Sequence, residues 1–338
     1  MTKRSAGTTC ARLIACFREY KMIDPLVRDD VRGFLSFLEG LPGPKLNELS
    51  PGEARVLAQS VYSQVEVEIG TVQTLSDLEI DTPGGHLLRA RLFDARTERV
   101  PSPVLVFFHG GGWVVGGLDA YAPLCAEVAR ALMVPVVSVE YRLAPEHPWP
   151  AAADDAEAAA RWLASASSEL GFEATGLVLA GESAGGNLAI ITTIALRDRP
   201  AAVPVVAHWA ICPVTDLVTP YASADQFGQG YFLTSGMLAW FSACYRPDPQ
   251  NWRASPIVAA FAGMPAAVVT TASLDPVRDQ GRAYASALVE AGVPVAFHEA
   301  QGNIHGFTSF RRAIPSSQAD LEVALDALAN LLARRRIG

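Results

Sequence analysis

The sequence predicts an α/β fold, in which a mostly parallel central sheet is flanked by helices. From Thr74 onward, short apolar runs rich in β-branched residues alternate with longer segments of helical periodicity. The runs are apolar throughout, so the strands that they form need cover on both faces, and the intervening helices supply it. At 338 residues, the chain is long enough for one large domain with an elaboration.

Composition and charge exclude several classes of protein. The formal net charge of −8 argues against a nucleic-acid partner, because phosphate binding depends on clustered Lys and Arg. The five cysteines show no CxxC spacing, so neither a disulfide framework nor a zinc site is indicated, and a reducing compartment fits. No apolar run reaches the length of a membrane span, and the N-terminus carries no clear cleavage site. We expect a soluble, uncleaved, cytoplasmic protein.

The first part of the chain, residues 1–72, has helical character. Between 24 and 43, apolar residues recur at steps near three and four, and a glycine-rich stop follows them. At Thr74 the period changes to strict alternation, and residues 81–85 predict a turn between two antiparallel strands. The apolar positions of the N-terminal helix are Val27, Val31, Phe34, Leu35 and Leu38.

Buried strands and helices are expected to alternate through the rest of the chain, with one interruption. Between about 215 and 250, an aromatic-rich helix among loops breaks the alternation, and we expect an insertion there. The predicted strands are 104–108, 135–139, 177–180, 205–211, 267–271 and 295–298. The predicted helices are 121–132, 152–165, 185–197, 279–290 and 317–335.

Ser183 lies in the run LVLAGESAGGNLAI, where a predicted strand passes directly into a predicted helix. The glycines at 181 and 185 are small enough to let strand and helix approach closely across a sharp turn. Such a turn exposes the serine hydroxyl at the carboxyl end of the strand, where open α/β sheets bind ligands. Ser183 is therefore the predicted nucleophile.

A serine hydroxyl needs a base to take its proton and a carboxylate to orient that base. In this type of fold the expected chain order is serine, acid, histidine. We favour His305, on a loop between Gly302 and Gly306, over His298, which lies within a predicted strand. Asp275 follows the preceding strand and is the predicted acid. The alternative, Asp279, opens a helix and is explained as its N-terminal cap.

The run VLVFFHGGGW supplies donors for a developing oxyanion. The first strong parallel strand ends at three glycines, 110–112, whose backbone N–H groups can face a negative charge. A phosphate-binding loop is the competing interpretation, but neither G-x-G-x-x-G nor G-x-x-x-x-G-K-[ST] fits the spacing.

Together these motifs resemble the bacterial branch of the hormone-sensitive lipase family of α/β-hydrolases. The matching pieces, in the family's order, are HGGGW at 109–113, YRLAPEH at 141–147, GESAGGN at 181–187, DPVRDQG at 275–281 and HGF at 305–307. The resemblance implies an α/β-hydrolase fold with a helical cap. The cap would comprise 1–72 and 215–250, and the catalytic domain 73–214 and 251–338.

The resemblance also implies an activity, that of a carboxylesterase acting on short- to medium-chain acyl esters without metal or cofactor. A homodimer is possible on the same ground. Ser183, Asp275 and His305 would form the triad, and the amides of Gly111, Gly112 and Ala184 the oxyanion hole. Supporting or pocket roles would fall to His109, Gly110, Trp113 and Glu182, and for Trp113 a place in the packed core is an equal alternative to a pocket wall. A turn that supports the oxyanion loop would contain Tyr141, Arg142 and Glu146.

Two departures from the family pattern concern the site. Glu182 stands where Asp is more usual, and Asn303-Ile304 stands where Met-Ile is commoner, which could alter how the histidine loop is held. Two other functions stay open. A ligand-binding relative is disfavoured by the presence of His305, because the plant gibberellin receptors of this family lack that histidine. An amidase or peptidase would use the same triad, but the chain has no β-propeller domain of the kind such peptidases often carry.

Overall fold

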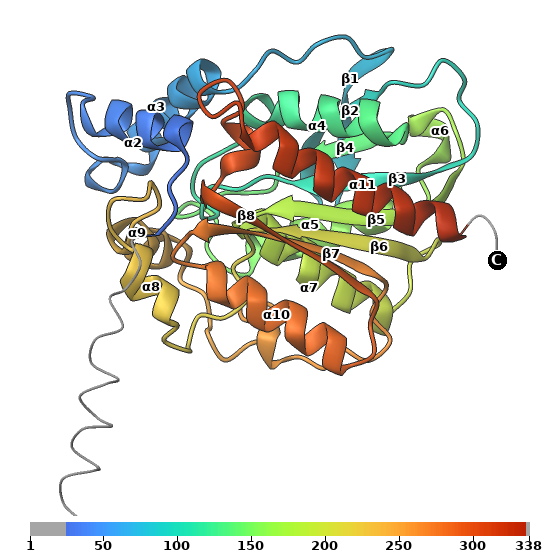
Figure 1. Cartoon of the computed structure of the whole chain (residues 1–338). Coiled ribbons are helices and arrows are strands. Elements are labelled where there is room, and N and C mark those ends of the chain that lie inside the picture. Colours follow the sequence, from blue (N-terminus) through green and yellow to red (C-terminus); the bar gives the residue numbers. More distant parts are fainter. Residues whose placement is uncertain (1–24, 336–338) are drawn as a thin grey trace, which may run out of the picture.

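The computed structural model describes residues 25–335 and is built on an eight-stranded sheet in the order β1-β2-β4-β3-β5-β6-β7-β8 (Figure 1). β1 pairs antiparallel with β2 and β2 antiparallel with β4, whereas the other pairings are parallel. The predicted mostly parallel sheet is thus confirmed. The strands are β1 (Thr74–Asp81), β2 (Leu87–Asp94), β3 (Ser102–Phe108), β4 (Val136–Val139), β5 (Ala174–Glu182), β6 (Val205–Ile211), β7 (Ala267–Leu274) and β8 (Val295–Ile304).

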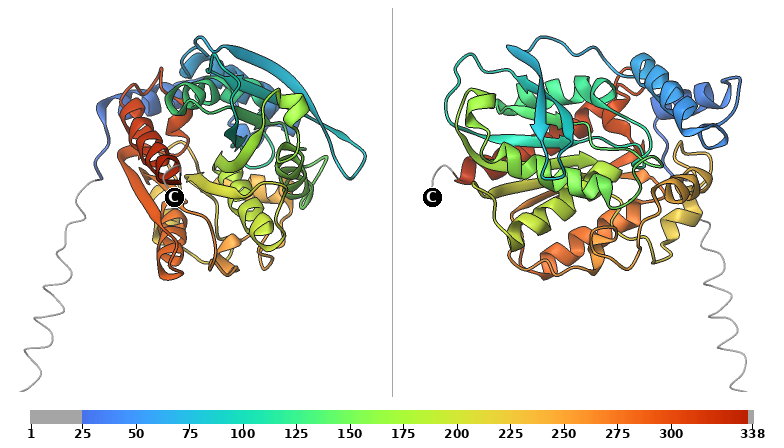
Figure 2. Two further views of the ribbon diagram at one scale, coloured as in Figure 1. Left: turned by 90° about the vertical axis from the view of Figure 1, so that its right-hand side faces the viewer. Right: turned by 180° about the vertical axis from the view of Figure 1, so that it is seen from behind.

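Helices cover both faces of the sheet, as the unbroken apolar strands require. Along β3, Val104, Val106 and Phe108 pack with α5 and α7 on one face, and Leu105 and Phe107 pack with α4 on the other. α10 joins the first face and α11 the second (Figures 1 and 2). The helices of these two layers are α4 (Leu118–Leu132), α5 (Ala151–Leu163), α7 (Ala184–Asp198), α10 (Arg278–Glu290) and α11 (Ser317–Arg335), with a short α6 (Ser167–Leu170) beside them.

Three parallel strands run further toward their carboxyl ends than the sequence predicted. β5 continues to Glu182, β7 to Leu274 and β8 to Ile304. The expectation that Gly302 opens a loop before His305 is therefore wrong. Gly302 takes a left-handed φ of 73° inside β8, and the pairing with β7 shifts register there but resumes at Leu274 and Ile304. This irregularity bends the strand without ending it.

The remaining helices lie together beyond the carboxyl ends of the parallel strands (Figures 1 and 2). They come from two distant parts of the chain: α2 (Asp29–Glu39), η1 (Leu46–Glu48) and α3 (Pro51–Val65) precede the sheet, and α8 (Ala222–Phe227) and α9 (Ser235–Tyr245) follow β6. Two further 3₁₀ turns are η2 (Pro256–Val258) and η3 (Phe307–Ser309). Our expectations about residues 1–24 lie outside the described part of the chain.

Local sequence explains where two of these helices begin. α3 starts at a capping box: the Ser50 hydroxyl accepts from the amide of Glu53, whose carboxylate accepts from the amide of Ser50. α9 begins after Thr234, whose hydroxyl accepts from the amide of Met237. The aromatic residues Tyr231 and Phe232 of the same segment precede Thr234 and lie outside α9. Across residues 25–335, no helix is both long and apolar enough to span a bilayer.

A buried ion pair ties the end of α3 to the segment after η3. Arg311 contacts the Glu66 carboxylate through its backbone amide at 3.0 Å and through Nε at 2.7 Å, and both side chains are 3% exposed. Burial raises the pKa of Glu66 even though the charge and hydrogen bonds of Arg311 act in the opposite direction. The ionised form of the Glu66 carboxylate therefore depends on Arg311 for its stability.

We expect Arg311→Leu to lower the free energy of unfolding by about 3–5 kcal/mol, because it leaves a buried carboxylate without a counter-charge. The double variant Glu66→Leu/Arg311→Leu should recover most of this loss, since it removes both charges. Urea unfolding of the wild type and the variants provides the comparison. A single variant no less stable than the double variant would contradict the assignment.

Candidate active site

Ser183 occupies a strained turn between the last residue of β5 and the first of α7. Its backbone angles, φ of 58° and ψ of −115°, lie in a region that residues other than glycine rarely adopt. The two flanking glycines have no room for a side chain: a Cβ on Gly181 would collide with the backbone of Gly185, and one on Gly185 with the carbonyl of Phe108. The Ser183 amide donates to the Ile211 carbonyl at 2.8 Å, which fixes the turn on β6. The predicted sharp turn is confirmed.

The predicted acid and base are in contact at the ends of neighbouring strands. Asp275 follows β7 and His305 follows β8, and Nδ1 of His305 lies 2.7 Å from Oδ2 of Asp275. The other carboxylate oxygen accepts from the amide of Val277 at 2.9 Å. Asp275 is fully buried and His305 is 6% exposed. Burial lowers the pKa of His305, but the charge and hydrogen bond of Asp275, with a smaller effect of Glu182, outweigh burial and leave that pKa raised.

Glu182 links the serine turn to the histidine segment. Its carboxylate accepts hydrogen bonds from the hydroxyl of Thr308, three positions after His305, and from the hydroxyl of Tyr121 at 2.7 Å. Within the described residues, no hydrogen bond joins Ser183 Oγ to the His305 ring. Such hydrogen bonds often form or tighten only when substrate binds. Glu182 thus brings the serine turn and the histidine segment together.

The pH dependence of activity should reflect the raised pKa of His305. If neutral His305 is the base, kcat/KM on a chemistry-limited ester should rise with pH through a value above the ordinary 6.5, because the His305 pKa is raised. Burial raises the pKa of Glu182, whereas hydrogen bonds from Thr308 and Tyr121 favour its ionised form. Over the pH range in which Glu182 is ionised, Glu182→Gln should move the acidic limb to lower pH, since it removes a negative charge that favours the imidazolium. Glu127→Gln, which alters a surface pair on α4, is the matched control. A limb that stays in place or moves upward in Glu182→Gln would contradict the prediction.

The glycine loop after β3 lies against the nucleophile. A Cβ on Gly110 would come within 3.5 Å of the Ser183 Cβ. Gly111 and Gly112 have left-handed φ values of 114° and 60°. In the part of the chain that the structure describes, neither their amides nor that of Ala184 donate to a protein acceptor. Unpaired amides beside a nucleophile suit the binding of a developing oxyanion.

The residues flanking these glycines are part of the packed scaffold. The His109 ring is buried and stacks on Tyr141 with centroids 4.2 Å apart, and the Tyr141 hydroxyl donates to the His109 carbonyl at 2.8 Å. Burial lowers the pKa of His109 to about 4, so its ring stays neutral at pH 7. Trp113 is 4% exposed and stacks on Tyr245 at 4.3 Å. It belongs to the core, which is one of the two roles, pocket wall or packed core, between which the sequence did not decide.

Asp279 is not the N-terminal cap that we predicted. α10 begins at Arg278, its N-cap position is Val277, and Asp279 lies in the first turn. The Asp279 carboxylate accepts from the amide of Ser223 at 3.0 Å and so fixes the start of α8 on α10. The sequence could not reveal this partner, because Ser223 lies in the insertion, 56 positions away.

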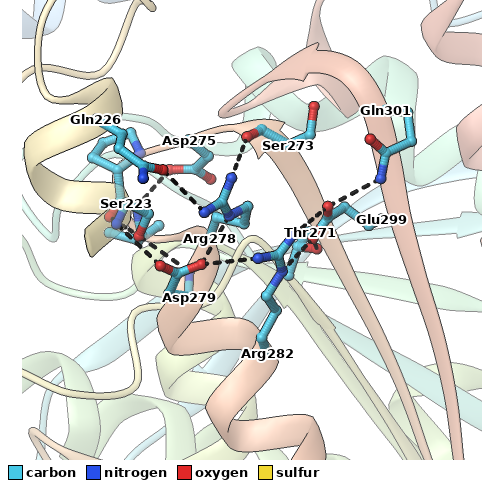
Figure 3. A network of polar contacts seen from close by, with 12 residues as sticks. Ser223, Gln226, Thr271, Ser273, Asp275, Arg278, Asp279, Arg282, Glu299 and Gln301 are labelled. Atoms are coloured by element: carbon cyan, nitrogen blue, oxygen red, sulfur yellow. Dashed lines mark hydrogen bonds and ion pairs between the residues drawn. The ribbon is translucent and has the colours of Figure 1, made fainter. Parts of the chain in front are cut away.

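Figure 3 shows the polar network beside the acid, between α8 and the ends of β7 and β8. Arg278 lies at its centre and donates to the Ser273 carbonyl at 3.1 Å and to Gln226 at 3.3 Å. The Ser273 hydroxyl accepts from the amide of Gly302 at 2.8 Å. The segment that carries Asp275 is therefore braced both by α8 and by the strand that leads to His305.

Asn303, the second departure from the family pattern, anchors the histidine strand. Its side-chain amide donates to the Ser317 hydroxyl at 3.0 Å and to Asp320 at 3.2 Å, both at the start of α11. Its side-chain oxygen accepts from the amide of Ile304 at 3.1 Å. All three polar contacts hold the backbone directly before His305. The asparagine at this position, where methionine is commoner in the family, therefore has specific hydrogen-bond partners.

Several groups near the site carried no recognisable signal in the sequence, among them Tyr121, Thr308 and Cys212. Donor atoms of Cys212, Asp275 and His305 lie within 4.8 Å of one another, a grouping that could hold a metal ion. Burial and the charges of Asp275 and Glu182 raise the pKa of the Cys212 thiol well above its ordinary value. A protonated thiol is a poor ligand, so we assign Cys212 to packing around the acid and histidine.

Comparison with known proteins agrees with the geometry. A family model described as an alpha/beta hydrolase fold matches residues 105–309, more than half of the chain. The chain belongs to the hormone-sensitive lipase family of α/β-hydrolases. Within this family it is similar to carboxylic ester hydrolase LipN of Mycobacterium tuberculosis, with 37% identity over 77% of this chain and 71% of the relative. It is also similar to ethyl acetate hydrolase of Pseudomonas putida, with 35% identity over 84% and 91%.

A solved structure extends the likeness from the sequence to the fold of most of this hormone-sensitive lipase family member. A thermostable esterase from Pseudomonas putida superposes with a TM-score of 0.86 at 31% identity, covering 92% of this chain and 99% of that one. The predicted α/β-hydrolase fold is thereby confirmed.

Proposed function

We propose that this chain is a serine carboxylesterase that hydrolyses short- to medium-chain acyl esters through an acyl-enzyme on Ser183. The observation that carries the proposal is the 2.7 Å contact between His305 and Asp275, on a segment that Thr308 joins to the residue before Ser183. At the level of enzyme class, the chain is a carboxylic ester hydrolase, the activity for which its relatives are named.

In the proposed reaction, Nε2 of neutral His305 takes the proton of Ser183 as its oxygen attacks the ester carbonyl. Asp275 holds the imidazole through Nδ1 and stabilises the imidazolium. The negative charge that forms on the carbonyl oxygen lies within reach of the amides of Gly111, Gly112 and Ala184. The imidazolium then protonates the leaving alcohol, and the acyl group stays on the serine. Water, deprotonated by the same histidine, releases the acid and regenerates the enzyme.

We also propose that α2, α3, α8 and α9 form a cap over this site, with the domain limits given above. In support, Phe232 packs on Phe310 with centroids 4.9 Å apart, and Phe34 packs on Phe310 at 5.2 Å, so both cap segments meet beside the histidine loop. A Cβ on Gly112 would collide with the ring of Phe241 from α9. Aromatic rings from the cap therefore lie against the oxyanion loop and beside the segment that follows His305, which favours compact acyl groups.

Profiling of hydrolysis with p-nitrophenyl esters from acetyl to palmitoyl, on the wild type and on Ser183→Ala, tests the proposal. We expect activity that is highest among the shorter esters and lost in the variant. Matched anilides separate an esterase from the amidase alternative, and an absence of turnover on every ester would favour a ligand-binding relative. The cytoplasmic location and the homodimer stay predictions.

A further inference from the structure

Arg55, on α3, reaches from the proposed cap into the backbone that carries the oxyanion loop. Its Nε donates to the Val114 carbonyl at 2.8 Å, and one terminal nitrogen donates to the Ala144 carbonyl at 2.8 Å. Both terminal nitrogens also contact the Glu146 carboxylate, at 2.9 and 2.6 Å. The guanidinium thus makes four hydrogen bonds to two chain segments that lie far from it in the sequence.

The two carbonyls that Arg55 holds belong to segments that are already joined. The Ala144 amide donates to the Trp113 carbonyl at 2.8 Å, so the turn after the glycines lies along the 141–147 segment. Arg55 binds on either side of this hydrogen bond, at Val114 and at Ala144. Among residues 25–335, no other group donates to these two carbonyls, so removing the guanidinium would leave both unpaired within the described part of the chain and would loosen the turn.

The orientation of this turn sets the direction of one oxyanion donor. The Gly111 carbonyl accepts from the amides of Val114 and Val115, each at 3.0 Å. The Gly111 carbonyl and the Gly112 N–H belong to one planar peptide unit and point in opposite directions. While the 114–115 backbone is held in place, the Gly112 N–H must therefore point away from the turn.

We propose that Arg55 is a positioning residue for the oxyanion hole, through which the cap fixes the orientation of the Gly112 N–H. The inference rests on the proposed function, because it assigns Arg55 to the same acyl-transfer step. Glu146 orients the guanidinium, and the hydrogen bonds from Arg55 lower the Glu146 pKa to about 2, so the pair stays charged throughout the working pH range. The cap accordingly contributes to catalysis through backbone geometry as well as by bordering the substrate.

The test compares wild type, Arg55→Ala, Arg55→Lys and Glu146→Gln on a short p-nitrophenyl ester and with an alkyl trifluoromethyl ketone. Ser183 adds to the ketone carbonyl, and the resulting oxyanion occupies the hole, so the inhibition constant reports donor alignment. Arg197→Ala is the matched control: Arg197 also joins a helix to a distant loop carbonyl, that of Ala260, but away from the site. Thermal midpoints show whether each variant is folded.

For Arg55→Ala we expect kcat to fall about 10- to 100-fold with KM nearly unchanged, because the donors are misaligned rather than removed. Affinity for the ketone should fall in parallel. Arg55→Lys should recover little, since one ammonium cannot reproduce the planar fork, and Glu146→Gln should be intermediate. Arg197→Ala should keep both constants.

An active wild type whose folded Arg55 variants keep kcat and ketone affinity would overturn the positioning role and leave the esterase proposal intact. If Arg55→Ala does not fold, Arg55→Lys and Glu146→Gln decide the matter by the same two constants. A wild type that cleaves no ester would instead refute the proposed function itself.

Discussion

Replacement of Ser183 by alanine is expected to lower kcat/KM on a short-chain ester by on the order of 10⁴-fold or more. The proposed reaction passes through a covalent bond to the serine oxygen, and no other hydroxyl occupies this turn. Alanine meets the same strain at a φ of 58° as serine does, so the fold should persist. Initial-rate assays together with thermal unfolding separate loss of chemistry from loss of structure. Residual activity within about tenfold of the wild type would show that the reaction uses another nucleophile.

Asp275→Asn is expected to lower kcat by about 10⁴-fold while leaving the geometry of the site nearly intact. Asp275 accepts the Nδ1 proton of His305 at 2.7 Å, whereas an amide can donate to Nδ1 and so favour the tautomer that has its proton on Nε2. In that tautomer Nε2 cannot take the serine proton. The buried imidazolium would also lose its counter-charge.

Asp279→Asn is the matched control for this effect. Asp279 lies four positions further along and contacts the Ser223 amide and Arg278 rather than the histidine. We expect it to change kcat by less than about tenfold, an effect transmitted only through the packing of α8. Equal losses in the two variants would mean that Asp275 acts through general structure and not through the imidazole.

The parts of the site that the sequence predicted are those specified by local patterns. Strand, glycine, serine, glycine and helix define the turn at Ser183 within a few residues, and its left-handed backbone follows from that arrangement. Asp275 and His305 could be chosen because parallel strands place their carboxyl ends at one edge of the sheet, so that residues after neighbouring strands meet there. β7 and β8 are such neighbours.

The parts that the sequence did not predict depend on contacts between distant segments. Thr308 and Glu182 are 126 positions apart, and Arg55 and Glu146 are 91 apart, so no local period relates the partners. The misjudged end of β8 has a different origin. Gly302 is typical of a loop opening, yet the sheet accommodates it as an irregularity because pairing with β7 resumes beyond it. The role of Trp113 could not be decided because core and pocket walls share the same composition.

The most direct test of the central claim is the reaction of the protein with an alkyl fluorophosphonate, followed by mass spectrometry. In this reaction the serine oxygen forms a bond to phosphorus as fluoride leaves, which requires an activated hydroxyl beside a base. We expect one adduct per chain, on the peptide that contains Ser183, no adduct in Ser183→Ala and much slower labelling in His305→Gln. An unlabelled wild type, or an adduct on another residue with Ser183 unmodified, would contradict the proposal that His305 activates this hydroxyl.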